Sequence, residues 1–175
     1  ELMSLGLGII YLGLESGNRE VLKRIRKNAT AEQMIRAGKR VKEAGILLSV
    51  TVLLGIGGVE LSQAHAEDTG KVLSAMDPEY VGALSLIIVP GTPIAEELET
   101  GKLVLPTPFE LIRELGTMIA NCRFTNCFFA SNHASNYLPL RIRMPGEKEK
   151  ALQLIQAVLQ KKDPGLLRPE YMRAL

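Results

Sequence analysis

The stretch "IIYLGLESGN", residues 9–18, decides the fold class and raises a chemical question. Its first part is aliphatic, which is typical of a buried strand, yet it ends in the carboxylate of Glu15. A buried strand rarely carries an ionised group unless a partner compensates for its removal from water. Ser16 and Gly17 follow, and then a charged stretch with helical character begins. We therefore expect a strand, a turn and a helix, with Glu15 at the strand end.

Two further strand-like runs follow, at residues 46–54 and 80–89, and helical patterns fill both gaps. The first gap contains the charged helix "NREVLKRIRK" and then a second helix that starts at Thr30. Gln33 stands at the spacing from Thr30 that forms a capping box. The second gap contains a helix over residues 62–76. Strands that alternate with helices in this way predict βαβ units and a parallel sheet.

Side-chain alternation within these strands favours a barrel wall over a flat sheet. In residues 46–54 every even position is a bulky aliphatic residue, whereas Ser49 and Thr51 stand at odd positions. The third strand has Ala83 and Ser85 at odd positions, and we assign both to a small and polar lumen face. The first strand divides in the same way, with Ile10, Leu12 and Leu14 on one face and Tyr11, Gly13 and Glu15 on the other. Such asymmetry predicts an α/β fold with an incomplete (β/α) TIM-like barrel of parallel strands, helices outside and a lumen inside.

The part after the third strand predicts a C-terminal α/β extension. A turn at "PGTPI" leads to a short helix that ends near Gly101, and a longer helix covers residues 108–121. The stretch "FTNCFFASN" is typical of a fourth strand, and "HASNYLPLRIRMPG" of an irregular loop. Pro145 opens a last amphipathic helix, and the tail from Asp163 has the character of a surface coil.

Composition and charge restrict the class of protein. The chain has 175 residues, of which 46% are hydrophobic and 23% charged, an ordinary globular mixture. A net charge of +2 without a Lys/Arg run gives no indication of nucleic-acid binding. The apolar runs are too short to span a membrane, and no signal peptide is visible. The two cysteines, Cys122 and Cys127, fit a reducing compartment and structural roles, so we expect a cytoplasmic protein.

The ends of the predicted strands share an unusual composition. They are "ESGN" at 15–18, "GIGGVE" at 55–60, "PGTP" at 90–93 and "SNHASN" at 131–136. In a barrel of parallel strands, the loops at the carboxyl ends meet on one rim and form the site. We therefore expect a ligand site on this rim.

Residues 11–58, "YLGLESGNREVLKRIRKNATAEQMIRAGKRVKEAGILLSVTVLLGIGG", strongly resemble the second half of a radical SAM domain. The similar branch contains elongator-like, methylthiotransferase-like and oxygen-independent coproporphyrinogen oxidase-like proteins. Shared features are the "GLESG" strand end, a helix that ends in basic residues, a glycine loop after the next strand and a strand that ends in "PGTP". The resemblance covers residues 1–100, and "TNCFFASNHASNYLPL" resembles the C-terminal extension of an uncharacterised subgroup.

The resemblance implies three parts. Residues 1–105 would be the second half of a partial radical SAM barrel, with strands 4 to 6 of the parent. Residues 106–162 would be a C-terminal extension of helix, strand, rim loop and helix, and residues 163–175 a tail.

The resemblance also implies cofactor contacts. The position of Glu15 hydrogen-bonds S-adenosylmethionine in the family, and the position of Lys27 pairs with the methionine carboxylate. Thr51 matches a position that reaches the ribose, and the glycine loop and Val89 match segments beside the adenine. The implied cofactor-binding residues are Glu15, Ser16, Lys27, Thr51, Gly55, Gly57, Gly58 and Val89.

Two departures from the family matter. Gly57 and Val59 stand where relatives often have Pro and Glu in a "GLPGE" loop. The "CxxxCxxC" motif that binds the 4Fe–4S cluster is missing, and Cys122 and Cys127 have the wrong spacing. The chain also starts with Glu1 rather than Met. We therefore expect the C-terminal part of a longer enzyme that neither assembles a cluster nor is active by itself.

The parent enzyme implied by the resemblance is a radical SAM iron–sulfur oxidoreductase. It would reductively cleave S-adenosylmethionine and abstract a hydrogen atom from an unknown substrate. Its partners would be the missing N-terminal half, that substrate and an electron donor such as flavodoxin or ferredoxin. We expect no tightly bound cofactor and no metal in the fragment, no membrane or nucleic-acid partner, and self-association along the open strand 9–15.

Several alternatives remain open at this stage. Glu15 could pair with a lysine for structure alone, Lys27 could be solvated, and Thr51 could be barrel filling. We expect His65 on a solvated helix face, and His133 as a candidate catalytic residue. The candidate substrate-binding residues beside it are Asn132, His133, Asn136 and Tyr137. Competing functions are a metal-free βα domain that binds a phosphorylated small molecule at its glycine loops, or a non-catalytic interaction module that uses the C-terminal helices.

Overall fold

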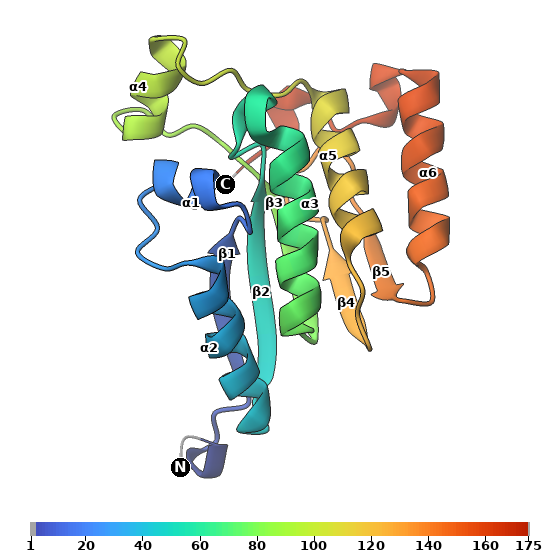
Figure 1. Cartoon of the computed structure of the whole chain (residues 1–175). Helices are drawn as coiled ribbons and strands as arrows, with labels where there is room; N and C mark the ends of the chain where they lie inside the picture. The colour runs from blue at the N-terminus through green and yellow to red at the C-terminus, as the bar shows by residue number, and fades with distance from the viewer. Residues whose placement is uncertain (1–2, 175) are drawn as a thin grey trace.

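The computed structural model describes residues 3–174, and a single five-stranded sheet forms its centre (Figure 1). The strands are β1 (Ile9–Glu15), β2 (Leu47–Leu54), β3 (Tyr80–Ser85), β4 (Cys127–Ala130) and β5 (Arg141–Met144). They lie in sequence order, the first four parallel and β5 antiparallel to β4. The prediction of adjacent parallel strands in chain order is confirmed.

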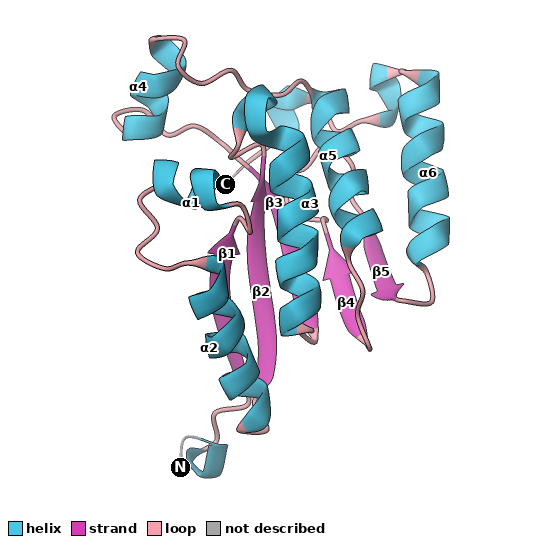
Figure 2. Cartoon of the chain, viewed as in Figure 1, coloured by secondary structure: helices cyan, strands magenta, loops and turns pink. Residues whose placement is uncertain are grey.

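The long helices pack on one face of this sheet (Figure 2). The helices are α1 (Arg19–Arg24), α2 (Ala31–Glu43), α3 (Gly58–Met76), α4 (Pro93–Glu99), α5 (Pro108–Asn121) and α6 (Lys148–Lys161), with short 3-10 turns at Met3–Leu5, Pro164–Leu166 and Glu170–Met172. Helices α2, α3, α5 and α6 lie over the sheet, on what we call the covered face, and α1 and α4 lie at its carboxyl edge. We call the opposite face the open face. One helical layer on a parallel sheet is the arrangement of a barrel wall and confirms the predicted fold class.

Local sequence signals explain where these helices start. Thr30 and Gln33 form the predicted capping box of α2, and Thr107 and Glu110 form another at α5. Asn18 caps α1 by accepting the N–H groups of its first turn. Within residues 3–174, no helix combines the length and the apolar character needed to cross a membrane.

The hydrophobic core lies between the covered face and the helices. Its centre on β2 is a row of alternating aliphatic side chains that are at most 2% exposed: Leu48, Val50, Val52 and Leu54. Leu73 of α3 and Met118 of α5 pack against this row and are fully buried. Each such burial contributes about 1.5–3 kcal/mol of transfer free energy. The predicted apolar face of β2 is therefore correct.

The predicted faces of the third strand are wrong. Pairing sets Ala83 beside Val52 and Ser85 beside Leu54, so both residues lie on the covered face and not toward a lumen. Ala83 is 1% exposed within the core, and the Ser85 hydroxyl donates to Asn136. Small side chains occur here because other segments pack closely on them. Size alone therefore does not identify the lumen face of a strand.

Three further boundaries differ from the prediction. β3 ends at Ser85 rather than at Val89. The segment expected as an irregular loop contains β5, in which exposed arginines alternate with buried apolar residues. The tail expected as a surface coil contains two 3-10 turns, and its Arg168 and Arg173 donate hydrogen bonds to the 133–137 segment. Pairing with β4 orders residues 141–144, and the arginine contacts order the tail. Neither can be deduced from local composition.

Candidate functional site

The carboxyl ends of β1, β2 and β3 lie side by side at one edge of the sheet (Figure 1). The turn 16–18 follows β1, the glycine loop 55–58 follows β2, and the segment 86–92 follows β3. We call this edge the rim. The topology thus brings together three of the loops singled out in the sequence.

Glu15 is set over the open face by a local distortion of β1. Its φ is 61°, in the left-handed region that non-glycine residues rarely adopt. The pairing with β2 shifts register between Gly13 and Glu15, as in a bulge. A Cβ atom on Gly13 would lie 2.4 Å from Glu15 Oε1, so a larger residue there would displace the carboxylate from its present position. Tyr11, on the same face, is 73% exposed. Glu15, Gly13 and Tyr11 therefore share the open face.

Lys27 is the ion-pair partner of Glu15. Its Nζ lies 3.2 Å from Glu15 Oε1, and the two side chains are 28% and 23% exposed. The backbone of Lys27 is held by its N–H, which donates to Leu22 in α1. The sequence left open whether Glu15 pairs with a lysine for structure alone. Its partner is Lys27, the residue to which the family resemblance assigns a contact with S-adenosylmethionine. A half-exposed pair of this kind adds about 0–1 kcal/mol to stability, so a zwitterionic ligand can separate it at small cost.

Small residues form a low floor beside this pair. Thr51 of β2 is paired with Gly13 of β1 and with Gly82 of β3, and Gly82 is paired with Ala130 of β4. The row crosses four adjacent strands on the open face. Without large side chains there, a flat or branched ligand group has room to lie against the sheet.

The glycine loop is explained largely by packing within the chain. Gly55 has φ 82° and donates its N–H to Glu114 Oε1 at 2.7 Å. A Cβ on Gly58 would lie 2.7 Å from Leu103 Cδ1, and the N–H of Val59 donates to Val104. These donors already have protein acceptors, which argues against a phosphate cradle at this loop.

Ser16 and His65 lie beneath the rim rather than on it. Both are fully buried, and Ser16 Oγ lies 2.8 Å from His65 Nδ1. The expectation of a solvated His65 is wrong, because α3 packs against both the sheet and α5. Small residues at helical spacing, Ala66, Thr69 and Gly70, signal this close packing in the sequence. Ser16 thus positions the turn after Glu15, and its predicted cofactor contact stays a proposal.

Glu114 is a buried carboxylate that the sequence analysis missed. Its oxygens accept the N–H of Gly55 and the hydroxyl of Ser62. Burial raises the pKa of Glu114 to about 7, against these two hydrogen bonds. His65 Nε2 lies 3.5 Å from Glu114 Oε1, and burial lowers the pKa of His65 to about 4. A glutamate between Leu111 and Leu115 on the apolar stripe of α5 is the signal that could have revealed it.

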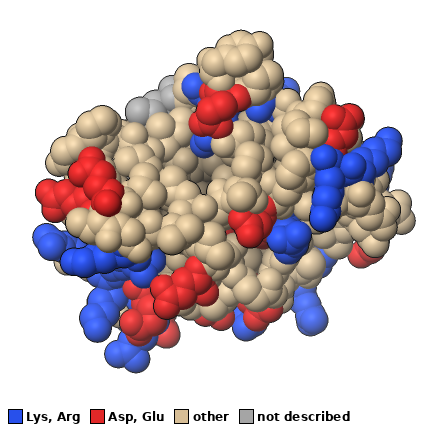
Figure 3. Space-filling view, turned by 90° about the horizontal axis from the view of Figure 1, so that it is seen from above, with Lys and Arg blue, Asp and Glu red and all other residues tan. Residues whose placement is uncertain are grey.

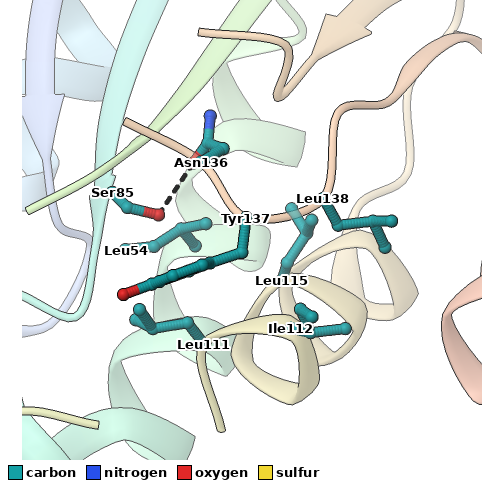
Figure 4. A pocket seen from close by; sticks show the side chains of 8 residues that line it. All are labelled: Leu54, Ser85, Leu111, Ile112, Leu115, Asn136, Tyr137 and Leu138. Carbon is teal, nitrogen blue, oxygen red and sulfur yellow. Dashed lines mark hydrogen bonds between the residues drawn. The ribbon is translucent and has the colours of Figure 1, made fainter. Parts of the chain in front are cut away.

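Two of the predicted substrate-binding residues, Asn136 and Tyr137, are engaged in the structure (Figure 4). Asn136 is 1% exposed, donates to Ala83 O at 2.8 Å and accepts from Ser85 Oγ at 2.8 Å. Tyr137 Oη donates to Glu170 and accepts from Arg173. The cavity beside Leu54 and Tyr137 measures about 10 Å³, which is room for about one water molecule. These residues hold the rim loop in place.

His133 and Asn132 are more accessible. His133 is exposed, with Nδ1 3.0 Å from Ser135 Oγ. The Asn132 amide, with its oxygen toward Arg141, accepts from Arg141 Nη2 at 2.7 Å. β2 and β3 stand between β1 and β4, so the loop after β4 is about 14 Å from Glu15 at ordinary strand spacing. The structure therefore does not bring His133 to the Glu15–Lys27 pair.

Larger cavities also border the rim, and one of about 360 Å³ has Gly57 and Gly58 in its lining. One of about 250 Å³ lies between α1, the glycine loop and α4, and Arg24, Ile56, Leu86 and Ile94 are among its lining residues. Another of about 660 Å³ includes Lys27 in its lining. Seen from above, this end of the molecule carries both charge signs interspersed rather than one continuous patch (Figure 3). Val89, 44% exposed, lies in the loop between β3 and α4.

The described residues do not fit an iron–sulfur cluster. Cys122 and Cys127 are buried in the core, where burial raises the pKa of each thiol to about 12. Cluster ligands are thiolates, so these protonated side chains are unsuited to the task. Across residues 3–174, no group of three or more His, Cys, Asp or Glu side chains could hold a metal ion.

Comparison with known proteins finds a family match for one part of the chain and a similar fold. Residues 1–68 match the family model of the radical SAM superfamily. The fold resembles the archaeal Methanocaldococcus infernus Elp3 with an N-terminal deletion (1-46), at a TM-score of 0.60 and 18% identity. The likeness covers 94% of this chain and 38% of that one, and at this identity it concerns the fold alone. No curated protein matches the chain.

The resemblance to a radical SAM domain that was stated for residues 1–100 is confirmed by the family match over residues 1–68. The chain spans 38% of the length of that Elp3 structure.

Proposed function

We propose that this chain is the S-adenosylmethionine-binding C-terminal part of a radical SAM iron–sulfur enzyme. The observation that carries the proposal is the accessible Glu15–Lys27 pair at the carboxyl end of β1, inside the segment that matches the family. The methionine part of S-adenosylmethionine carries an ammonium and a carboxylate. Glu15 would accept hydrogen bonds from the ammonium, and Lys27 would pair with the carboxylate. The ligand thus replaces one ion pair by two.

The floor of the open face suits the nucleoside part of the same ligand. Thr51 stands between Gly13 and Gly82, so its hydroxyl can reach a ribose without competition from large neighbours. Loop 55–58 and Val89 border this floor on the rim and would contact the adenine. Ser16 would act from beneath, by holding the turn that carries Glu15.

The activity that we propose for the whole protein is reductive cleavage of S-adenosylmethionine and hydrogen-atom abstraction from an unknown substrate. When bound, the cofactor supplies the 5′-deoxyadenosyl group for this chemistry. The residues of this chain bind and orient that group and limit the access of water to it. The cluster ligands would come from an N-terminal half that pairs along β1, and electrons from a flavodoxin- or ferredoxin-like donor.

One structural fact favours this function over a metal-free phosphate-binding domain. The N–H groups of Gly55, Gly58 and Val59 all donate to acceptors within the chain. A phosphate cradle requires such donors to be free. No comparable observation favours an interaction module.

The test is cofactor affinity in the anaerobically reconstituted full-length enzyme. Glu15→Ala and Lys27→Ala should each weaken S-adenosylmethionine binding by about 1.5–3 kcal/mol, the value of one charged hydrogen bond, or about 10-fold or more. Glu149→Ala, at an exposed position on α6, is the matched control and should leave affinity unchanged. Unchanged affinity in Glu15→Ala would show that the pair is structural only.

A further inference from the structure

A buried chain of polar groups joins two of the rim turns. Ser16 Oγ, in the turn after β1, lies 2.8 Å from His65 Nδ1. On the other side of the ring, His65 Nε2 lies 3.5 Å from Glu114 Oε1, which accepts the N–H of Gly55 at 2.7 Å. The connection thus runs from the turn after β1 to the turn after β2, through one residue of α3 and one of α5.

The three side chains of this connection, Ser16, His65 and Glu114, are inaccessible to a substrate. The side chains of His65 and Glu114 have 0% exposure, and Ser16 is fully buried. Ser16 Oγ also accepts the N–H of Asn18 at 3.0 Å. A serine, a histidine and a glutamate in this order have the composition of a hydrolytic triad, but a buried serine cannot attack a substrate. Ser16, His65 and Glu114 therefore form an internal connection between the two turns.

The contacts of the His65 ring define two protonation states of the pair: Nδ1 lies 2.8 Å from Ser16 Oγ and 3.3 Å from Thr69 Oγ1, and Nε2 faces Glu114. When Glu114 is ionised, neutral His65 keeps its proton on Nε2, facing the carboxylate, and Ser16 donates its hydroxyl to Nδ1. When the pair holds one more proton, this proton lies between Glu114 and Nε2, and Nδ1–H then donates to Ser16. Among the described residues, Nε2 has no hydrogen-bond partner, and the Glu114 carboxylate is the charged group that it faces, at 3.5 Å.

The surroundings favour the neutral pair. Burial raises the pKa of Glu114 to about 7 and lowers that of His65 to about 4. Asp68, one turn along α3, is the other charged group that acts on the ring, and it opposes part of the effect of burial. The pair as a unit therefore takes up one proton near neutral pH.

We propose that His65 and Glu114 are positioning residues that hold the Ser16 turn and the Gly55 turn in one geometry, and that protonation of the pair reverses the hydrogen bond between His65 and Ser16. In the protonated state Ser16 Oγ accepts from both Asn18 and His65, and its own hydroxyl proton loses its acceptor. The Ser16 turn keeps both hydrogen bonds, but the bond to His65 now runs in the opposite direction and a buried hydroxyl proton is left unpaired. The consequence for S-adenosylmethionine rests on the function proposed above; the reversal itself does not.

The reversal is tested by NMR of the isotope-labelled imidazole nitrogens in the full chain. The sequence has two histidines, so His133→Asn assigns the His65 signals. We expect His65 to carry its proton on Nε2 at about pH 8.5 and on Nδ1 at about pH 5.5, with a midpoint near the Glu114 pKa of about 7. Glu114→Gln mimics the protonated carboxyl and should keep the proton on Nδ1 throughout. If His65 keeps one tautomer from about pH 5.5 to about pH 8.5 in the unmodified chain, the proposal is overturned. A tautomer change with pH that persists in Glu114→Gln would also overturn it.

A second measurement separates this inference from the proposed function. In the reconstituted full-length enzyme, S-adenosylmethionine affinity should fall by about 2- to 10-fold between the two pH values, because a buried hydroxyl proton of the Glu15 turn is left without an acceptor at the lower pH. Glu114→Gln should bind at the low-pH level at both values. A tautomer reversal without any cofactor binding would refute the function but not the positioning pair. Binding that depends on Glu15, together with a fixed His65 tautomer, would refute the pair but not the function.

Discussion

Polar side chains gather at two parts of the rim, and the two parts differ in what these side chains contact. After β1, Glu15 and Lys27 contact each other and remain about a quarter exposed. After β4, Asn136 and Tyr137 are bound to backbone, serine, glutamate and arginine partners within the chain. Polar composition at a strand end is thus shared by an accessible pair and by a saturated loop. Only the contacts tell the two apart, and only the accessible pair is a candidate for ligand binding.

The saturated loop should depend strongly on Asn136, and this is the largest effect that we expect. Asn136→Ala removes two buried hydrogen bonds and leaves Ala83 O and Ser85 Oγ without a partner. An unsatisfied buried group costs about 1–3 kcal/mol, so the free energy of unfolding should fall by about 3 kcal/mol. Urea denaturation measures this loss. Asn132→Ala, whose side chain is only partly buried, is the control and should change stability much less; equal effects of the two variants would contradict the division.

The buried pair of His65 and Glu114, beneath the accessible part of the rim, should affect how the free energy of unfolding depends on pH. The pKa of His65 falls from 6.5 to about 4 on folding, so its contribution is present above pH 6.5 and is lost as pH falls toward 4. The pKa of Glu114 rises from 4.5 to about 7, so its contribution is present below pH 4.5 and is lost as pH rises toward 7. Between pH 4.5 and 6.5 the two slopes oppose and largely cancel.

Glu114→Gln removes one of these slopes and leaves the other. Its stability should therefore rise with pH by about 1 kcal/mol per unit between pH 4.5 and 6.5, about 2 kcal/mol in total. Denaturant unfolding at several pH values measures the slope, with the unmodified chain as the flat reference. A variant as flat as the unmodified chain would mean that His65 does not resist protonation.

The tail should be anchored to the saturated loop by Arg173. Its guanidinium lies 4.2 Å over the Tyr137 ring and donates to Ser135 O and Leu86 O. Arg173→Ala should lower the free energy of unfolding by about 1–1.5 kcal/mol and speed proteolytic cleavage within residues 163–174. Arg123→Ala, at an exposed position, is the matched control. Unaltered cleavage would show that the tail is held by other contacts.

How far the sequence predicts this molecule depends on the range of the forces involved. Period-2 alternation in β2 identified the covered face, because burial acts on each side chain separately. The faces of β3 depend on register with β2, which local pattern does not contain. The burial of His65 and Glu114 follows from the packing of α3 on α5, a tertiary contact. Lys27 came from the family resemblance alone, and its contact with Glu15 confirms proximity rather than cofactor binding.

Loss of the Glu15 carboxylate should change the stability of the protein very little, and this is the smallest effect on stability that we expect. Glu15→Ala breaks one half-exposed ion pair, so the free energy of unfolding should change by less than about 1 kcal/mol. Glu15→Gly, which suits the left-handed φ of 61°, is the matched variant: if it is more stable than Glu15→Ala, the backbone at this position is strained in the native chain.

The comparison between the two parts of the rim depends on this result. A residue kept for stability should cost stability when it is removed, as we expect for Asn136. A carboxylate that occupies a left-handed backbone position and contributes little to folding has no structural justification of that kind. A loss of more than about 2 kcal/mol in Glu15→Ala, beyond what an exposed pair provides, would make the Glu15–Lys27 pair a structural element like the saturated loop. A small loss together with weakened S-adenosylmethionine binding would leave ligand binding as the reason for a charge at the end of an aliphatic strand.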